Sequence, residues 1–183
     1  AGSDFAYSDT NYILLGLVIE KVSKMSMYIY INKYILEPFK LKSISPQVSR
    51  KIDGLVIGYN KEDDEFFPGV VVENGEYKYN VQFEWAGGGY VLNALDLAHA
   101  GKLIYEGKMF DKSILKEFFN GIDAKQHGGK WGLGVHIMDT PMGKSYGHSG
   151  FFPGYMTNMM YFPEHKFAIA IQVNTSDGKN LGL

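Results

Sequence analysis

The sequence predicts an α+β protein in which helices pack on one antiparallel sheet, and the order of its patterns carries that prediction. In the first half, apolar residues recur at three- and four-residue steps, which is typical of helices. The last third instead carries short runs of β-branched and aromatic residues separated by turns, which is typical of strands. Because helices come first and strands last, without regular alternation, the helices should cover an antiparallel sheet.

A single domain is expected from a chain of 183 residues, of which 45% are hydrophobic and 15% aromatic. Such a chain buries one sizeable core and is short for two. The formal net charge of −2 leaves no basic excess for a phosphate backbone, so no nucleic acid partner is expected. No apolar run approaches the roughly 18 residues of a membrane span, so no membrane segment is expected within these residues.

No metal and no other cofactor are expected. The sequence has no cysteine, which excludes disulfides, thiolate metal sites and cysteine nucleophiles, and which leaves the cellular compartment open. Its five histidines show neither the HExxH nor the HxH spacing that zinc ligands often have.

Two helices are expected near the N-terminus. Residues 13–22 carry apolar side chains on a broad face, which predicts a mostly buried helix. The oxygen-bearing side chains of residues 8–10 are placed to cap its first turn. A second helical pattern covers residues 27–36 and ends before Pro38, because a residue that precedes proline is disfavoured in the helical conformation.

The rest of the chain consists of a segment outside the core, followed by further helices and strands. Residues 40–82 carry short and mixed signals, which we interpret as an excursion from the core, with strands over 52–59 and 70–72 and a hairpin turn over 73–76. A glycine-rich bend follows at residues 87–89. Beyond it, helices are expected over residues 94–105 and 113–119, and strands over 131–138, 144–148, 155–162 and 166–174.

Residues 147–155 are interpreted as the wall of an active site, because they form a turn of small residues that contains a histidine and leads into a strand. A single residue of these types is weak evidence for a catalytic role. Tyr7 alone is more often a core tyrosine, Asp9 a helix cap and His148 a hydrogen-bonded loop histidine.

Five segments in a fixed order give these residues a context. They are FAYSDTNYILLGLVIE, LEPFKL, WAGGGYVLNALDLAHAGKLI, WGLGV and GHSGFFPGYMTNMMYFPEHKFAIAIQVN. Together they resemble, across nearly the whole chain, the serine beta-lactamase and penicillin-binding-protein-like hydrolases, which include class C beta-lactamases, DD-peptidases, D-aminopeptidases and esterases. The first segment resembles the YxN element, the third the AGG turn, and the last the H/KxG element with two strands.

The resemblance implies a serine hydrolase that acts on amide or ester bonds through an acyl-enzyme, which water then releases. Tyr7 matches the tyrosine that takes the proton of the serine. A phenol, whose ordinary pKa is about 10, must lie near cations to do so at neutral pH. His148 matches the lysine or histidine that would lend positive charge to the phenol and to a substrate carboxylate. The backbone N–H of Phe151 matches one donor of the oxyanion hole.

Three further residues are implied to bind the substrate, which would be a D-amino-acid peptide, a beta-lactam or an ester. Ser149 would hydrogen-bond it, and Gly150 would let it approach the strand edge without a side chain in the way. Asp9 stands where the family has asparagine. It replaces an amide that can donate with an anion that only accepts, which argues against beta-lactam binding. The histidine form of the last element favours a peptidase or an esterase.

In the resembled family the nucleophilic serine and its lysine, spaced SxxK, lie well N-terminal to the tyrosine element. We therefore expect this chain to be the C-terminal portion of a single domain, missing an N-terminal segment and a helix after residues 174–178, and inactive alone. None of its own serines is taken as the nucleophile. By the same resemblance the whole enzyme would be periplasmic or secreted. A non-catalytic relative that binds peptidoglycan-like peptides stays open as the alternative, and Asp9 favours it.

Overall fold

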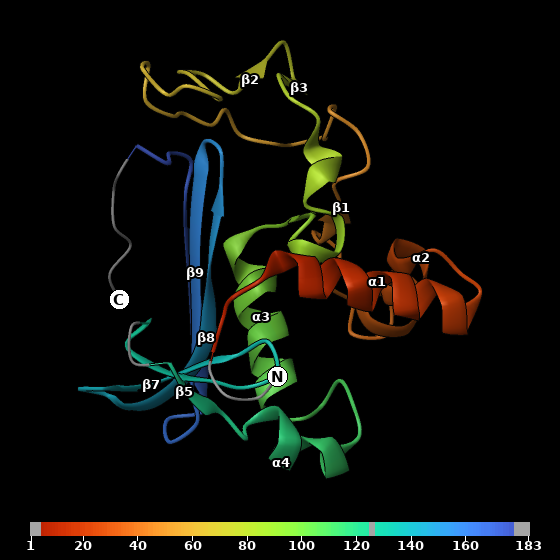
Figure 1. The fold of residues 1–183 in the computed structure, drawn as a ribbon, viewed down its shortest axis with the longest axis vertical. Coiled ribbons are helices and arrows are strands. Elements are labelled where there is room, and N and C mark those ends of the chain that lie inside the picture. Colours follow the sequence, from red (N-terminus) through yellow and green to blue (C-terminus); the bar gives the residue numbers. More distant parts are fainter. Residues whose placement is uncertain (1–4, 125–126, 178–183) are drawn as a thin grey trace. The chain divides into compact units, whose positions relative to one another are not determined.

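A computed structural model describes residues 5–124 and 127–177 and confirms the α+β architecture (Figure 1). The helical elements are α1 (Asp9–Ser23), α2 (Met27–Ile31), a π-helical turn (Asn32–Leu36), α3 (Ala94–Tyr105), α4 (Leu115–Phe118) and 3-10 turns at Val81–Phe83, Trp85–Gly87 and Lys112–Ile114. The strands are β1 (Ser45–Pro46), β2 (Val72–Glu73), β3 (Glu76–Tyr77), β4 (Tyr90–Val91), β5 (Ile122–Ala124), β6 (Gly129–Trp131), β7 (His136–Thr140), β8 (Gly143–Phe152), β9 (Tyr155–Phe162) and β10 (Phe167–Val173).

The main sheet is a meander of six strands in the order β10-β9-β8-β7-β6-β5, so each strand pairs with its neighbours in the sequence. Short connections such as the two residues between β8 and β9 require antiparallel pairing. In the register of β7 with β8, His136 pairs with Gly147. The register of β6 with β7 pairs Trp131 with the same histidine.

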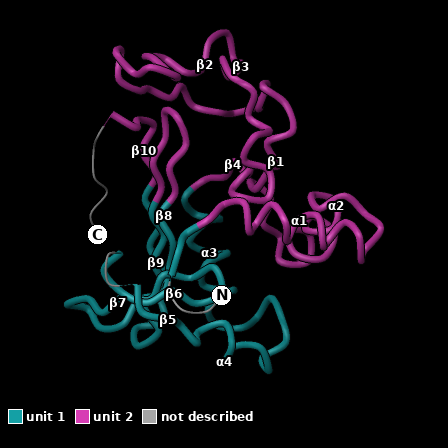
Figure 2. Tube along the Cα trace, viewed as in Figure 1, with its two compact units in different colours: residues 1–7, 94–149, 158–171 teal, residues 8–93, 150–157, 172–183 magenta. Residues whose placement is uncertain are grey.

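Contacts between residues divide the chain into two compact units (Figure 2). The first unit consists of residues 1–7, 94–149 and 158–171, and the second of residues 8–93, 150–157 and 172–183. Strands β8, β9 and β10 contribute residues to both units.

The core of the first unit lies between α3, α4 and the sheet. Its buried side chains are Tyr105, Val135, Ile137, Met159 and Tyr161. Gly101 of α3 lets the helix approach β9 closely, since a Cβ at this position would collide with the sulfur of Met159.

The core of the second unit is built around the β2–β3 hairpin. Its buried side chains are Val71, Val72, Tyr77 and Val81, with Phe152 and Tyr155 packed against them. The hairpin turns at Asn74 and Gly75, whose φ angles of 52° and 77° fit the type I′ turn that asparagine and glycine favour. The expected hairpin is therefore confirmed, but its first strand covers Val72–Glu73 and not residues 70–72.

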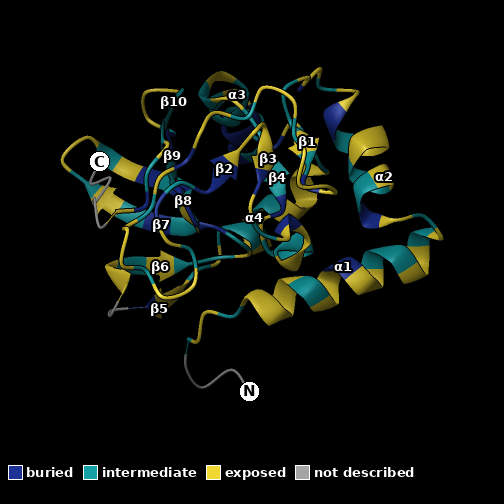
Figure 3. Ribbon diagram, turned by 90° about the horizontal axis from the view of Figure 1, so that it is seen from above, coloured by how far each residue is buried: buried dark blue, intermediate teal, exposed yellow. Residues whose placement is uncertain are grey.

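The expectation that the first helix is mostly buried is wrong. The helix forms as α1, but Gly16 is its only buried residue, and the ribbon of α1 is coloured mostly as exposed or intermediate (Figure 3). Leu14 and Val18 are about half exposed, and Val22 is 75% exposed. An apolar periodicity indicates a helix face that is suited to burial. The described residues do not cover that face of α1. Ser8 precedes the helix without making a side-chain cap bond, so its capping role is also not observed.

Other expected elements differ in their limits. Helix 94–105 and strand 155–162 are confirmed at both ends, and helix 27–36 is confirmed with a π-helical second half. The strand over 52–59 is wrong, because among the described residues of that segment only isolated bridges form. The strand over 131–138 divides into β6 and β7, since Gly134, with a φ of 71°, turns the chain back into a hairpin. The expected helix after residues 174–178 would begin outside the described residues.

None of the helices in the described part of the chain has the length and apolar composition that crossing a bilayer requires. Within the same part, no group of three or more acidic or histidine side chains is arranged to hold a metal ion.

Candidate active site

Tyr7 and His148 meet in the first unit although 141 positions separate them in the sequence. The phenolic oxygen of Tyr7 lies 3.5 Å from Nε2 of His148, and the two ring centroids are 5.9 Å apart. Tyr7 lies in the segment just before α1 and is 45% exposed, whereas His148 is held in strand β8. The structure thus brings together the two residues to which the resemblance assigned the proton chemistry.

The second nitrogen of His148 fixes how this pair shares its proton. Nδ1 lies within hydrogen-bonding distance of the backbone carbonyl oxygen of Ser149. A carbonyl oxygen only accepts, so Nδ1 carries a hydrogen and the neutral imidazole presents Nε2 as an acceptor. Tyr7 then donates its O–H to His148. When the imidazole is protonated the direction reverses, and Nε2–H donates to the phenolic oxygen.

Aromatic rings surround the pair, and Trp131 contacts the rings of both Tyr7 and His148, at centroid distances of 5.5 Å and 5.1 Å. His136 stacks on the same indole at 4.8 Å, with 11° between the planes. Burial lowers the pKa of His136, and so does the positive charge of His148. Sequence reasoning missed Trp131 and His136 as site residues, and the WGLGV segment was the only signal that pointed toward them.

Glycines flank His148 in β8 for different reasons. A Cβ at Gly147 would collide with the backbone carbonyl of Met159 in β9, so a side chain here would push the two strands apart. A Cβ at Gly150 would make only an ordinary contact, 3.6 Å from Thr157. Folding therefore demands glycine at position 147 but not at position 150.

The remaining expected site residues are divided between the units. Ser149 belongs to the first unit, whereas Asp9, Gly150 and Phe151 belong to the second. Phe151 is 66% exposed. The roles assigned to these four residues stay predictions.

Within the second unit, Asp9 lies in the first turn of α1, where the helix dipole favours a negative charge. Glu84 is its neighbour across the glycine-rich bend, and a Cβ at Gly87 would lie 3.4 Å from the Glu84 carboxylate and 3.6 Å from Cβ of Asp9. Burial raises the pKa of Glu84, and the charge of Asp9 raises it further. Asp9, at the position where the resemblance predicts asparagine, thus stands beside a second carboxylate.

Two serines carry a lysine three positions further on, Ser113 before Lys116 and Ser176 before Lys179, which the sequence analysis overlooked. The hydroxyl of Ser113 bonds the carboxylate of Asp111 in a short helical turn. Ser176 is buried; its hydroxyl donates to Asn60 and accepts from the backbone N–H of Gly154. Both hydroxyls are committed to local bonds, which argues against a nucleophilic role for either serine.

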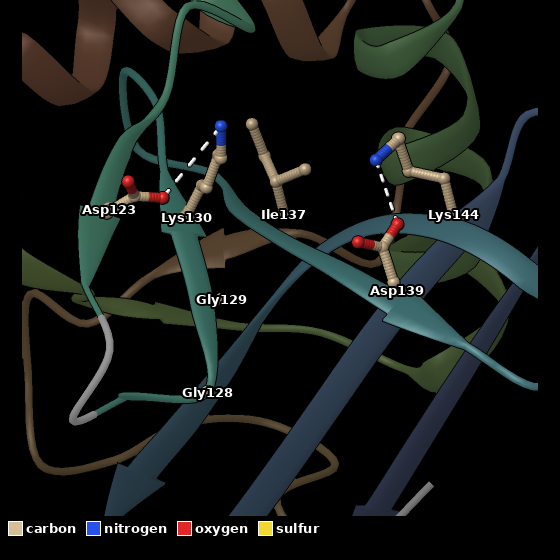
Figure 4. Close-up of a pocket in the computed structure, with 7 residues that line it drawn as sticks. All are labelled: Asp123, Gly128, Gly129, Lys130, Ile137, Asp139 and Lys144. Atoms are coloured by element: carbon tan, nitrogen blue, oxygen red, sulfur yellow. Dashed lines mark hydrogen bonds and ion pairs between the residues drawn. The ribbon is translucent and has the colours of Figure 1, made fainter.

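A polar cavity of about 330 Å³ lies elsewhere on the first unit (Figure 4). Lys130 and Ile137 line it, and they are adjacent in sequence to Trp131 and His136 respectively. Because successive side chains of a strand point to opposite faces of the sheet, the cavity opens on the face away from the Trp131–His136 stack. Lys130 pairs with Asp123 at 3.8 Å and Lys144 with Asp139 at 2.9 Å, so its charges are matched.

Comparison with known proteins agrees with the fold. Residues 1–181 match the sequence model of the beta-lactamase family, so the chain belongs to that family. A penicillin-binding protein of Bacillus subtilis is 27% identical over 173 residues, which are 87% of this chain and 37% of that protein.

Solved structures show the same fold. A D-stereospecific amidohydrolase from Streptomyces sp. superposes with a TM-score of 0.82 at 22% identity, over 95% of this chain and 51% of that one. A D-amino acid amidase from Ochrobactrum anthropi, solved in complex with D-phenylalanine, gives a TM-score of 0.78 at 18% identity, over 97% of this chain and 57% of that one. The chain therefore spans little more than half of the two solved structures and 37% of the Bacillus subtilis protein.

Proposed function

We propose that this chain supplies the general-base half of a serine hydrolase that cleaves amide or ester bonds through an acyl-enzyme. The observation that carries the proposal is the contact of the Tyr7 phenol with Nε2 of His148. Membership of the beta-lactamase family supports it, as does the likeness in fold to amidases that act on D-amino acid derivatives.

In this mechanism the nucleophilic serine loses its proton to the oxygen of Tyr7 as it attacks the carbonyl carbon. With neutral His148, the phenolic proton passes on to Nε2, which accepts from the phenol in this tautomer. The imidazole then carries the positive charge of the transferred proton. The backbone N–H of Phe151 would donate to the oxyanion, and Ser149, Gly150 and Asp9 would line the substrate subsite.

The nucleophile is proposed to come from polypeptide outside these 183 residues. The hydroxyls of Ser113 and Ser176 are committed to local bonds, and the chain covers about half of each related structure.

The exposure of α1 supports the same proposal. Five large apolar side chains of this helix are at least half exposed, namely Leu14, Leu15, Leu17, Val18 and Val22. Contiguous apolar surface of this kind marks an interaction site on a soluble protein. We infer that the segment that carries the nucleophile packs on this helix.

Turnover of a chromogenic D-phenylalanine amide tests the proposal, with the 183-residue chain compared with a longer polypeptide that adds the family's SxxK segment. We expect turnover only from the longer polypeptide. Tyr7→Phe should lower its kcat/KM by roughly 10²- to 10⁴-fold, the usual contribution of a general base. The matched control is Tyr12→Phe, a tyrosine of α1, which should leave turnover within about twofold.

A fluorophosphonate label checks the nucleophile in the same samples. The 183-residue chain should remain unlabelled. Its Ser113→Ala variant is the control, because any label that depended on Ser113 would be lost in it. Turnover by the short chain, or full activity of Tyr7→Phe in the longer one, would overturn the proposal. The comparisons give no support to the alternative of a non-catalytic peptide-binding relative.

A further inference from the structure

Trp131 is the one aromatic side chain with a described ring contact to both Tyr7 and His148. The indole meets both rings edge to face, with interplanar angles of 69° to Tyr7 and 80° to His148. Both geometries are favourable for aromatic pairs. Phe5, just ahead of Tyr7, stacks on the same indole at 5.5 Å. Trp131 therefore contacts the segment that carries the tyrosine and the strand residue that carries the imidazole.

The direct link between Tyr7 and His148 is too weak to set their geometry. Its O···N distance of 3.5 Å lies at the long limit for a hydrogen bond. Tyr7 is 45% exposed and belongs to no helix or strand. An exposed side chain on an irregular segment retains rotamer freedom unless a neighbour restricts it. The ring contacts with Trp131 contribute to that restriction.

The plane of Trp131 is itself fixed from the sheet. Trp131 and His136 are register partners on β6 and β7, and their rings stack nearly parallel. Burial, then the charge of His148, lower the pKa of His136, which favours a neutral ring in the stack. Within the described chain, the buried Nε1 of Trp131 has no hydrogen-bond partner. The indole therefore acts through its ring.

We propose that Trp131 is a positioning residue, whose ring, held against His136, sets the relative orientation of the Tyr7 phenol and the His148 imidazole. The consequence for catalysis rests on the proposed function, whereas the orientation itself does not. The inference predicts that an aromatic ring at position 131 is required for the Tyr7–His148 contact and that its N–H is not.

Nuclear Overhauser effects between the rings of Tyr7 and His148 test this in the 183-residue chain. We expect them in the wild type and in Trp131→Phe, and we expect their loss in Trp131→Leu, while the amide spectrum outside the ring cluster stays unchanged. A folded Trp131→Leu variant that retains them would overturn the proposal, and so would a folded Trp131→Phe variant that loses them.

Fluorescence gives a second test that leaves Trp131 in place and does not depend on the folding of its variants. In a Trp85→Phe background Trp131 is the only tryptophan, and the imidazole of His148 in ring contact should quench it. His148→Gln should therefore raise the emission of Trp131. Emission that is the same with and without His148 would contradict the inferred contact.

Turnover then separates this inference from the proposed function. In a polypeptide that hydrolyses substrate, Trp131→Leu should lower kcat at least tenfold with KM within about twofold, and Trp131→Phe should restore most of the rate. If no polypeptide shows turnover, the proposed function fails while the ring measurements stand. A change in KM with kcat unchanged in Trp131→Leu would overturn the positioning role.

Discussion

Asp9 places a carboxylate where the resemblance predicts an amide, and the structure gives that carboxylate an acidic neighbour. The two side chains of Asp9 and Glu84 converge beside Gly87. Burial is the larger cause of the raised pKa of Glu84, and repulsion by Asp9 is the smaller. The negative charge of Asp9 therefore raises the pKa of a residue just ahead of the glycine-rich bend.

Asp9→Asn should lower the pKa of Glu84 toward its ordinary value without restoring it fully, because burial remains. Carboxyl carbon shifts of Glu84, followed by NMR from pH 3 to 8, measure this. Since a raised folded pKa disfavours the charged carboxylate, Glu84 should favour folding at low pH and lose that contribution as pH rises through its folded pKa. An unchanged titration of Glu84 in Asp9→Asn would show that the two carboxylates do not interact.

The sequence predicted some residues of the candidate site and not others, for a physical reason. Tyr7 and His148 stand in short elements whose order along the chain is distinctive, so both were expected. Trp131 and His136 were not, because their importance arises from strand register and ring geometry. A linear pattern states neither which residues are paired across a hairpin nor which rings stack.

Among the elements, α3 is tied to β9 by one carboxylate. Glu106, just past the helix, forms ion pairs with Lys102 at 2.7 Å and Lys108 at 2.6 Å. It also accepts a hydrogen bond from the hydroxyl of Tyr161 in β9 at 3.1 Å. Hydrogen bonds from Lys102 and Lys108 lower the pKa of Glu106 from 4.5 to about 2.

Glu106 should therefore stabilise the fold above pH 4.5 and lose that contribution as pH falls toward 2. Urea unfolding of wild type and Glu106→Gln from pH 2 to 6 measures it. The wild type should be the more stable at pH 6, by about 1 kcal/mol or less because solvent screens these pairs, and the difference should vanish near pH 2. Glu117→Gln, at an exposed carboxylate of α4, is the control and should show no such trend.

Helix α1 offers a test of its exposed apolar face. In the 183-residue chain, Leu14→Lys with Val18→Lys should change the free energy of unfolding by no more than about 0.5 kcal/mol, because both side chains are half exposed. The pair should also reduce any self-association seen by sedimentation. In a polypeptide that includes the proposed covering segment, the same pair should be strongly destabilising.

Gly16→Ala is the matched control on the buried side of α1. A Cβ here would lie 2.7 Å from Cβ of Ala86 and 2.9 Å from the ring of Trp85, so it should cost about 1–3 kcal/mol in the short chain. A short chain more sensitive to the lysine pair than to Gly16→Ala would mean that the outward face of α1 is already covered.

The elements were predictable where local signals suffice. Helix α3 has a clear apolar period, and Ala94 and Tyr105 bound it as expected. The alternation in segment 131–138 continues through Gly132 and Gly134 and so predicts one strand, and only the turn at Gly134 separates β6 from β7. The exposure of α1 was unpredictable for another reason, since a sequence pattern shows which face can be buried but not whether a partner is present.

At the scale of the whole molecule, β8, β9 and β10 contribute to both compact units, so each of these strands is part of two sets of contacts. A strand loses its ladder bonds as a unit when its neighbours melt. Continuous strands therefore favour a single cooperative transition, as expected for one domain of this length.

The two tryptophans report on the two units separately, because Trp85 belongs to the second unit and Trp131 to the first. Trp131→Phe leaves Trp85 as the only reporter, and Trp85→Phe leaves Trp131. Each variant shifts stability on its own, so the emission of each should be compared with far-ultraviolet circular dichroism of the same variant during urea unfolding. The two signals should coincide within each variant, because the shared strands couple the units. A tryptophan transition displaced from the dichroism midpoint in either variant would mean that the units unfold independently, and that the strands connect them without making them one folding unit.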